Sequence, residues 1–296
     1  MVDQEDLEAL DSLLWMSSSH RAASITHTNQ STVIRRTHKV LSIFGGHVAR
    51  TPRGWRVRGA SEMLKLERRV HQCFRFRARR PLRLHAPYWS SSELWRLPMG
   101  PWICNPPDRT HACENPLDLL TERIIDACLL TPTQLEEISP EQAAALAMFP
   151  IYRSSIDLLI WAGPATAAVT AEARSADAAG GGASAVQLHL FPFLPHSCRS
   201  RSAAWFQQNG DQDLEIPAIS SIQRGPRYRA AFLTPEMLRP LGLQVVTEHQ
   251  VGLPYTETLV YLAEHAGEPG THQLIDVLVD HFAARPFPVG REERRR

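Results

Sequence analysis

The sequence lacks a hydrophobic run long enough to cross a membrane, which would need about 20 consecutive apolar residues. Residues 1–16 carry five acidic side chains where a secretory signal would have a basic start and an apolar middle. The five cysteines form no close framework, and their odd number leaves at least one unpaired, so disulfides are not expected. We therefore expect a cytoplasmic protein that does not contact a membrane.

Common catalytic and metal-binding motifs are also missing. The chain has no Gly-x-Ser-x-Gly elbow and no Gly-x-Gly-x-x-Gly turn, and the glycines at 180–182 are not followed by the Lys-Ser/Thr of a phosphate loop. Cys104, His111 and Cys113 lie close together, but their spacing is not that of a zinc site and a fourth ligand would have to come from far away. These absences argue against an enzyme, and we expect no cofactor and no metal.

Charge is distributed unevenly along the 296 residues, although the net charge is only +1. Residues 1–83 hold 16 Lys and Arg against 7 Asp and Glu, whereas the remainder holds 16 against 24. Clustered basic side chains gain affinity for a polyanion by displacing its counterions. The basic first part therefore suggests a polyanion partner.

Three short helices are predicted in the basic part. Leucines at helical spacing follow an acidic first turn at residues 7–14, a second helix covers 20–25, and Asn29 is the expected N-cap of a third helix that ends at Gly45. The third helix would expose side chains able to contact phosphates and base edges: Gln30, Ser31, Thr32, Arg35, Arg36, His38 and Lys39. The alternative is an amphipathic helix whose charged face meets only solvent.

A turn at residues 51–54 leads into a short alternating strand at 55–58, which is the pattern of a wing. Wings place basic side chains beside the duplex, so phosphate or minor-groove contacts are expected from Arg50, Arg53, Arg56 and Arg58.

A fourth helix is predicted from Ser61 to about Arg77. Met63, Leu66, Val70 and Cys73 follow one another at steps of three, four and three residues, which is the spacing of a coiled-coil seam. Two copies of this helix could pair through the seam and form a dimer. The alternative is a helix packed only on its own domain.

Beyond Pro81 the pattern changes to short apolar strands that alternate with helices, which predicts an α/β fold. Strands are expected at 82–86, 124–130 and 149–160, and a second α/β portion is expected to run through 186–194, 203–208, 228–233, 235–238 and 245–251. Helices are expected at 117–123 and 271–284. Residues 162–184 read as a loose segment or a frayed helix, and the Arg-rich residues 291–296 as a disordered tail.

The N-terminal part resembles the winged helix-turn-helix of the LysR-type transcriptional regulators. The similarity runs through Arg21-Ala22-Ala23, the stretch from Asn29 to Arg36, Gly45, and Arg50 to Gly54. Weaker similarity to the effector domain of that family covers 119–127, 149–160 and 230–241. The family usually has apolar residues where Thr26, Thr28 and Thr37 stand, so the core of this head is expected to be unusually polar.

The resemblance implies a division into three parts. A winged helix-turn-helix DNA-binding domain would occupy residues 1–59 and a linker or dimerisation helix 60–80. An α/β effector domain of the periplasmic-binding-protein type would occupy 81–296, with subdomain I at about 81–161 plus a returning C-terminal segment and subdomain II at about 186–250.

The resemblance also implies partners and a function. A homodimer or homotetramer would read a pseudo-palindromic operator in double-stranded DNA, with RNA polymerase as a candidate further partner. A small-molecule effector of unknown identity would bind between the two α/β subdomains and favour one arrangement of the DNA-binding heads.

The candidate effector-binding residues are those that come directly after predicted strands of the α/β part. Ser90, Ser91 and Ser92 come after the first strand of the α/β part, and Thr131 and Pro132 come after a later one, at the carboxyl ends where open α/β sheets bind ligands. Serines that merely cap a helix at Glu93 are the alternative. Two other functions stay open: a DNA-binding regulator without an effector response, and an α/β enzyme whose N-terminal helices only dimerise.

Overall fold

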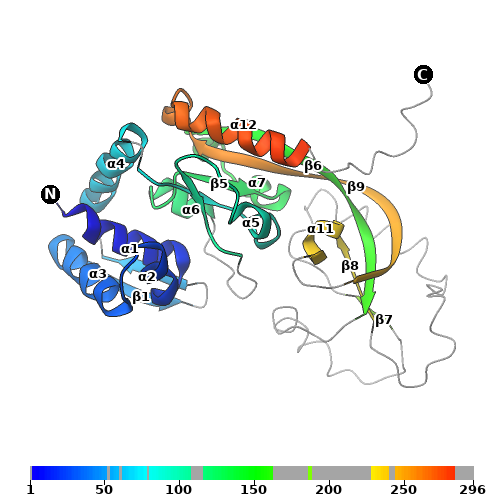
Figure 1. Cartoon of the computed structure of the whole chain (residues 1–296), viewed down its shortest axis with the longest axis horizontal. Helices are drawn as coiled ribbons and strands as arrows, with labels where there is room; N and C mark the ends of the chain where they lie inside the picture. The colour runs from blue at the N-terminus through cyan, green and yellow to red at the C-terminus, as the bar shows by residue number, and fades with distance from the viewer. Residues whose placement is uncertain are drawn as a thin grey trace. The chain divides into compact units, whose positions relative to one another are not determined.

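The computed structural model describes residues 2–51, 54–59, 62–78, 80–107, 116–162, 186–188, 228–239 and 244–283 (Figure 1). The chain divides into two compact units. The first unit comprises Met1–Leu130, Pro140–Phe149 and Leu259–Leu278, and the second comprises Thr131–Ser139, Pro150–Thr258 and Val279–Arg296. Across the described residues, no helix is both long and apolar enough to span a membrane.

Three helices form the head of the first unit: α1 (Gln4–Met16), α2 (Ser19–Ile25) and α3 (Gln30–Phe44). Each begins at a side-chain cap, because Asp3, Ser18 and Asn29 accept a hydrogen bond from a backbone N–H of the first turn. Small and branched apolar residues allow close packing of the three helices in a common core made of Ala9, Leu13, Ala22, Ala23 and Val33, with Ile34 and Trp55 against it.

An antiparallel hairpin follows α3, as the sequence predicts for a wing. Gly45 ends the helix in the left-handed conformation (φ 67°), which glycine adopts at little cost. Strands β1 (His47–Thr51) and β2 (Gly54–Arg58) then pair in the register His47 with Arg58 and Thr51 with Gly54. Helix α4 (Glu62–Arg77) continues the chain toward the α/β part.

Parallel strands form the α/β part of the first unit. Strand β3 (Leu82–His85) lies between β4 (Trp102–Cys104) and β5 (Ala127–Leu130). Helices α5 (Tyr88–Leu94), α6 (Pro116–Thr121) and α8 (Pro140–Ala143) complete it. The strand predicted at 124–130 begins only at Ala127, because Arg123 adopts a left-handed conformation (φ 61°) and residues 122–126 form a turn.

Two long strands, β6 (Leu146–Ala162) and β9 (Gln244–Leu262), contribute residues to both units. The hydrogen-bonded strand order is β4-β3-β5-β9-β6-β8-β7, with β8 (Tyr228–Leu233) antiparallel to β6 and parallel to β7 (Val186–Leu188). Helices α7 (Pro132–Glu136), α11 (Pro235–Leu238), η3 (Ala263–His265) and α12 (Pro269–Ala283) complete the described elements.

Several predictions fall on residues outside the described ranges: the segments 163–184, 189–194 and 203–208, and the tail at 291–296. The segment at 245–251, expected as part of the second α/β portion, lies in strand β9, which runs eleven residues further, to Leu262. In the sheet it lies between β5 and β6, so it has a hydrogen-bonded neighbour on each side.

Candidate nucleic-acid interface

The first turn of α3 is fixed by its cap. The Asn29 side chain accepts the backbone N–H of Thr32 at 2.8 Å and the hydroxyl hydrogen of Ser31 at 2.7 Å. At the other end, the N–H of Gly46 bonds to the carbonyl of Leu41 at 2.8 Å. Both ends of the helix are therefore held in place.

Helix α3 has one buried face and one exposed face. Its buried side consists of Val33, Thr37, Val40 and Leu41, which pack into the head. Gln30, Ser31, Arg35, His38 and Lys39 are exposed, whereas Thr32 and Arg36 are half-buried. The exposed residues include amide, hydroxyl and guanidinium groups, which are the groups that read base edges in a major groove.

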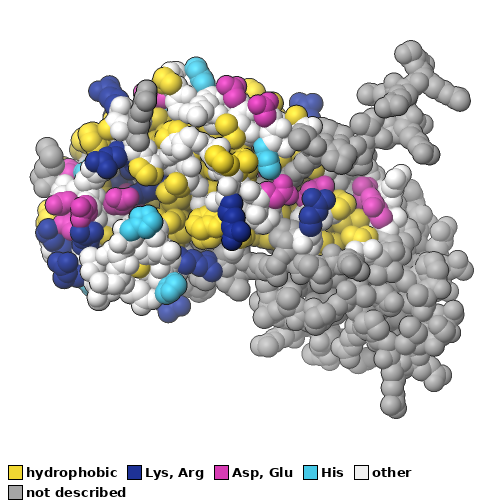
Figure 2. All heavy atoms as spheres, viewed as in Figure 1, with side chains coloured by type: hydrophobic (Ala, Val, Ile, Leu, Met, Phe, Trp, Pro, Cys, Tyr) yellow, Lys and Arg dark blue, Asp and Glu magenta, His cyan; other side chains and the backbone are white. Residues whose placement is uncertain are grey.

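Two of the predicted DNA contacts are paired with carboxylates of α1. Arg36 forms ion pairs with Glu5 and with Asp6, the second at 3.6 Å, and Lys39 pairs with Asp6. Basic and acidic side chains accordingly adjoin at this end of the first unit (Figure 2). Contact of Arg36 or Lys39 with a phosphate would require each to exchange its carboxylate partner.

Arg35, unlike Arg36, is not engaged by the carboxylates of α1. Its side chain is exposed, and in the part of the chain that the structure describes it has no acidic partner within ion-pair distance. A guanidinium group in this position keeps all its donors available for a ligand. Arg35 is therefore the candidate for bidentate contact with a base.

The wing holds its basic residues in different ways. Arg50 lies opposite Trp55 in the hairpin, with its guanidinium carbon 6.0 Å from the ring centroid. This cation–π contact restrains the side chain without neutralising it. Arg56 pairs with Asp118 of α6 at 3.6 Å. Arg58 is exposed, and Arg53 lies outside the described residues.

An apolar stripe along α4 is exposed to solvent. Met63, Leu66 and Val70 are 61%, 54% and 59% exposed, and Phe74 continues the stripe at 45%. The sequence analysis placed Cys73 at the end of this seam, but Cys73 is half-buried with a free thiol. Both Cys73 and Phe74 lie one helical turn after Val70, but only the Phe74 side chain is exposed, so Phe74 continues the stripe.

The opposite face of α4 is buried, and apart from Leu64 its buried residues are polar. Arg68 Nε donates to Asp11 of α1 at 2.8 Å, and Arg75 pairs with Asp126 at 2.7 Å. Gln72 also donates to the Asp126 carboxylate, at 3.1 Å. The helix therefore packs on its own chain through ion pairs and leaves its apolar face uncovered, which reverses the usual amphipathic arrangement.

The serines predicted for effector binding lie inside a helix. Helix α5 begins at Tyr88, so the alternative of a cap at Glu93 is wrong. Ser90 and Ser91 are buried, and the hydroxyls of Ser91 and Ser92 donate to carbonyls one turn earlier in α5. Their assignment to an effector stays a prediction, and it would require these hydroxyls to change partners.

Thr131 and Pro132 begin α7. The Thr131 hydroxyl accepts the N–H of Gln134 while the Gln134 side chain accepts the N–H of Thr131, which is a complete capping box. Thr131 is 1% exposed. Thr131 and Pro132 belong to the second unit, whereas the serines of α5 belong to the first.

His85, the last residue of β3, is a polar group that the sequence analysis missed. Its ring is buried, burial lowers its pKa from 6.5 to about 4, and its Nδ1 has no hydrogen-bond partner among the described residues. It lies beside Cys128 of β5 in the parallel register. A histidine at the carboxyl end of a predicted buried strand was the available signal.

The connection from β3 to α5 is fixed by Asn105. Its side-chain oxygen accepts the N–H of Ala86 at 2.7 Å, and its amide donates to the carbonyl of Ala86 at 3.0 Å. Cys104, next to it, is buried, and burial raises the pKa of its thiol. His111 and Cys113, which are close to Cys104 in the sequence, lie outside the described ranges, and no described group of side chains could hold a metal ion.

Comparison with known proteins gives structural matches only. No family model matches the chain, and no curated protein matches it. Among solved structures, ArgP from Mycobacterium tuberculosis is 13% identical with a TM-score of 0.41, covering 97% of this chain and 99% of its own. LysG from Corynebacterium glutamicum, a LysR-type regulator with bound arginine, is 16% identical with a TM-score of 0.38, covering 97% and 100%. CrgA, a LysR-type regulator from Neisseria meningitidis, is 13% identical with a TM-score of 0.35, covering 95% and 99%. The chain is thus similar, at low identity and over nearly its full length, to solved LysR-type regulators.

Proposed function

We propose that this chain is a sequence-specific DNA-binding transcriptional regulator of the LysR type. The observation that carries the proposal is the exposed face of α3, which presents Gln30, Ser31 and Arg35 from a capped helix backed by a packed head. A helix of this kind, joined to a short turn and followed by a hairpin, fits a major groove while the hairpin lies along the backbone.

Roles on the DNA follow from side-chain chemistry. Arg35 would donate two hydrogen bonds to guanine N7 and O6, because a guanidinium group matches that pair of acceptors. Ser31 and Thr32 would reach a phosphate or a thymine methyl group. Arg50 and Arg53 of the wing would position the head through the phosphates, which adds affinity without sequence preference.

Dimerisation through α4 is the second part of the proposal. The stripe of Met63, Leu66, Val70 and Phe74 is too apolar and too exposed for a helix that meets only water. A second copy of α4 would cover it and place two recognition helices on one duplex. Two heads reading the same DNA would explain a pseudo-palindromic operator.

Effector control is the third part. The end of β3 carries His85, and the serines of α5 follow it in the same unit, so a small molecule would meet polar groups there. The unpartnered Nδ1 of His85 supports this, because buried polar atoms are rarely left without a partner. An effector would act by binding one arrangement of the regulator better than another.

Fluorescence anisotropy tests the DNA-binding proposal. A pool of duplexes is first enriched for tight binders by selection, and the affinity for the winner is compared with that for random duplex. Arg35→Ala should weaken binding to the selected site by about 1–3 kcal/mol more than binding to random DNA. Arg96→Ala removes an exposed arginine after α5 and serves as the matched control, with no expected effect.

The outcomes of that experiment are distinct. Equal losses on both DNAs would make Arg35 a phosphate contact. Failure of the wild-type chain to bind any duplex, even in dilute salt where phosphate contacts are strongest, would reject the regulator proposal.

Light scattering tests the dimer. Val70→Asp places a charge on the proposed seam and should convert dimers to monomers. Val279→Asp on α12 is the matched control, because that valine is also exposed, at 37%. An unchanged mass for Val70→Asp would reject α4 as the dimer contact.

Thermal melting with a panel of metabolites tests the effector. A ligand of the folded state raises the melting temperature as its concentration exceeds its Kd. A shift that is abolished by His85→Leu would support the strand-end site. No shift with any compound would favour a regulator without an effector response.

A further inference from the structure

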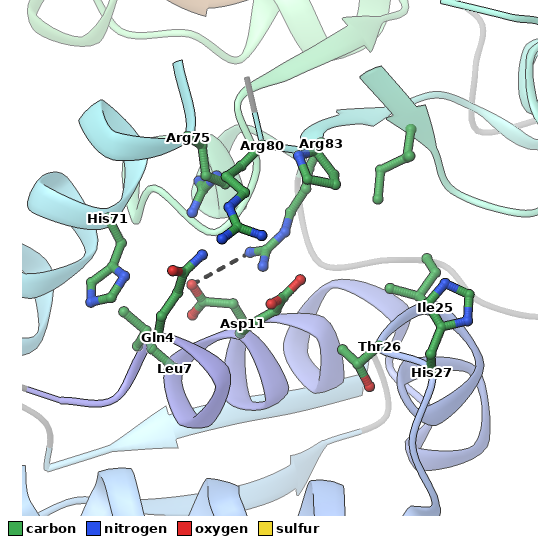
Figure 3. Close-up of a pocket in the computed structure, with 13 residues that line it drawn as sticks. Gln4, Leu7, Asp11, Ile25, Thr26, His27, His71, Arg75, Arg80 and Arg83 are labelled. Carbon is green, nitrogen blue, oxygen red and sulfur yellow. Dashed lines mark hydrogen bonds and ion pairs between the residues drawn. The ribbon is translucent and has the colours of Figure 1, made fainter. Parts of the chain in front are cut away.

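A cavity of about 300 Å³ opens in the first unit between the head and the elements that follow it (Figure 3). It is lined by residues of α1, α2 and α4 and by residues at and before β3 and in β4. None of the residues proposed above for DNA, effector or dimer contacts lines it. The proposed function leaves this cavity without a role.

One wall of the cavity is cationic. Arg75, Arg80 and Arg83 line it, and Figure 3 shows the guanidinium groups of Arg80 and Arg83 directed toward the centre. Arg75 is neutralised by Asp126 at 2.7 Å, and Arg83 Nη1 donates to the carbonyl of Ile124 at 2.8 Å and faces Asp11 at 3.5 Å. Burial, followed by the charge of Arg75, lowers the pKa of Arg83.

Arg80 is the cation of this wall that remains available. It is exposed, and none of the described acidic side chains lies within ion-pair distance of it. Its backbone is fixed, because its N–H bonds to the carbonyl of Arg75 at 3.2 Å at the end of α4. The side chain therefore presents donors to the cavity from a defined position.

The opposite wall, on α1, is acidic. Asp11 is already shared by Arg68 at 2.8 Å and Arg83 at 3.5 Å. Glu8, one turn earlier, also lines the cavity; its charge acts on Arg75 and Arg83, but within the described ranges no ion pair at 4 Å or less engages it. Leu7, Ile25 and Ile103 add apolar side chains to the lining.

We infer that this cavity binds an aliphatic α-amino acid, with the carboxylate on Arg80, the ammonium on Glu8 and the side chain against the apolar surface. One unpaired cation and one unpaired anion on opposite walls match a ligand that carries both charges. A purely anionic ligand would meet Glu8 and Asp11, and a purely cationic one would meet three arginines. A volume of about 300 Å³ lies at the lower end of small-molecule sites, as a ligand of this size requires.

Occupancy of the cavity would have a structural consequence. Its walls come from α1 and α2 of the head on one side and from α4 and β3 on the other. A ligand that contacts both sides stabilises the arrangement in which the head is docked on α4 and β3, because it binds that arrangement better than any other.

Isothermal titration calorimetry on the full chain tests the inference with three matched compounds. L-Leucine carries both charges, 4-methylpentanoate lacks the ammonium, and 3-methylbutylamine lacks the carboxylate. We expect L-leucine to bind about tenfold or more tightly than either analogue, because each charged hydrogen bond is lost with its group. L-Alanine, L-valine and L-methionine extend the series in side-chain size.

Two variants separate the contributions of the two walls. Glu8→Gln should bind L-leucine and 4-methylpentanoate alike, and Arg80→Gln should bind L-leucine and 3-methylbutylamine alike. Glu62→Gln and Arg96→Gln remove exposed charges elsewhere and should retain the wild-type preference. Circular dichroism checks that each variant is folded, which is expected because neither Glu8 nor Arg80 is buried.

The inference is overturned if none of the four amino acids binds at about 10 mM, a concentration above the Kd of even a weak site. It is also overturned if L-leucine binds but Glu8→Gln and Arg80→Gln keep the wild-type preference, because the ligand then lies elsewhere. The experiment contains no DNA, so its outcome is independent of the proposed function.

Discussion

Replacement of Asp11 by asparagine tests the buried ion pairs that join α1 to α4 and β3. The Asp11 side chain is 1% exposed, and its two partners, Arg68 and Arg83, are 3% and 4% exposed. Arg68 Nε lies 2.8 Å from one carboxylate oxygen, and Arg83 Nη1 lies 3.5 Å from the other. Asparagine keeps the shape and one acceptor but removes the charge.

The expected loss in the free energy of unfolding is about 3 kcal/mol. Removal of one partner of a buried ion pair costs about 3–5 kcal/mol, because the remaining charge stays buried without compensation. The lower end applies here, since Arg68 keeps Glu122 at 3.3 Å and Arg83 keeps the carbonyl of Ile124 at 2.8 Å.

Urea unfolding followed by tryptophan fluorescence measures the effect. Asp118→Asn is the matched control: its pair with Arg56 is 3.6 Å long and both side chains are about half exposed, so the expected loss is below about 0.5 kcal/mol. The double variant Asp11→Asn, Arg68→Gln should lose less than the sum of the single losses, because the two groups share one interaction.

The reasoning would be refuted by a loss of less than about 1 kcal/mol for Asp11→Asn, or by a loss equal to that of the control. Either result would mean that the cost of taking these charges out of water already cancels their attraction.

Three further predictions concern single residues of the first unit. The pKa of His85 is about 4 in the folded chain and 6.5 in the unfolded chain, so the unfolded chain takes up the proton first as the pH falls. His85 should therefore lower the free energy of unfolding by about 2.5 kcal/mol between pH 7 and pH 4.5. In urea titrations at the two pH values, His85→Leu should reduce the difference in stability by that amount. Thr37→Val should raise the free energy of unfolding by about 1 kcal/mol in the same assay, because the Thr37 hydroxyl is buried without a partner among the described residues and valine has nearly the same shape. A loss of stability would mean that the hydroxyl has a hydrogen-bond partner. Gly45→Ala should reduce the free energy of unfolding by about 1 kcal/mol and so lower the melting temperature, because this position has a φ of 67° with open space around it. Gly267→Ala is the control and should change little, because that position also has open space but no positive φ. Equal effects of the two variants would contradict the role of the backbone conformation.

Local chemistry made the boundaries of the head predictable. Asn29 can cap a helix without help from distant residues, and Gly45 can end one for the same reason, so α3 was placed correctly at both ends. The hairpin of the wing was likewise predictable from the turn residues at 51–54. Helix α5 was missed because its sequence carries no side-chain cap, its first residue following Pro87 directly.

The exposed surface was harder to predict than the helices. Periodicity shows which side of α3 is polar, but it does not show that Arg36 and Lys39 meet Glu5 and Asp6 while Arg35 does not. Those pairs join residues about 30 positions apart. Only the packing angle of α1 on α3 decides which cation is neutralised.

The sequence by itself determined the three helices of the head, the hairpin after them and three residues of the apolar stripe of α4, Met63, Leu66 and Val70, because caps, turn residues and residue spacing act over a few positions. Tertiary structure alone decided that α4 buries Arg68, Gln72 and Arg75, and that it leaves the stripe exposed. The physical reason is that these polar groups can be buried only where Asp11 and Asp126 neutralise them, and both carboxylates are brought there from more than 50 residues away.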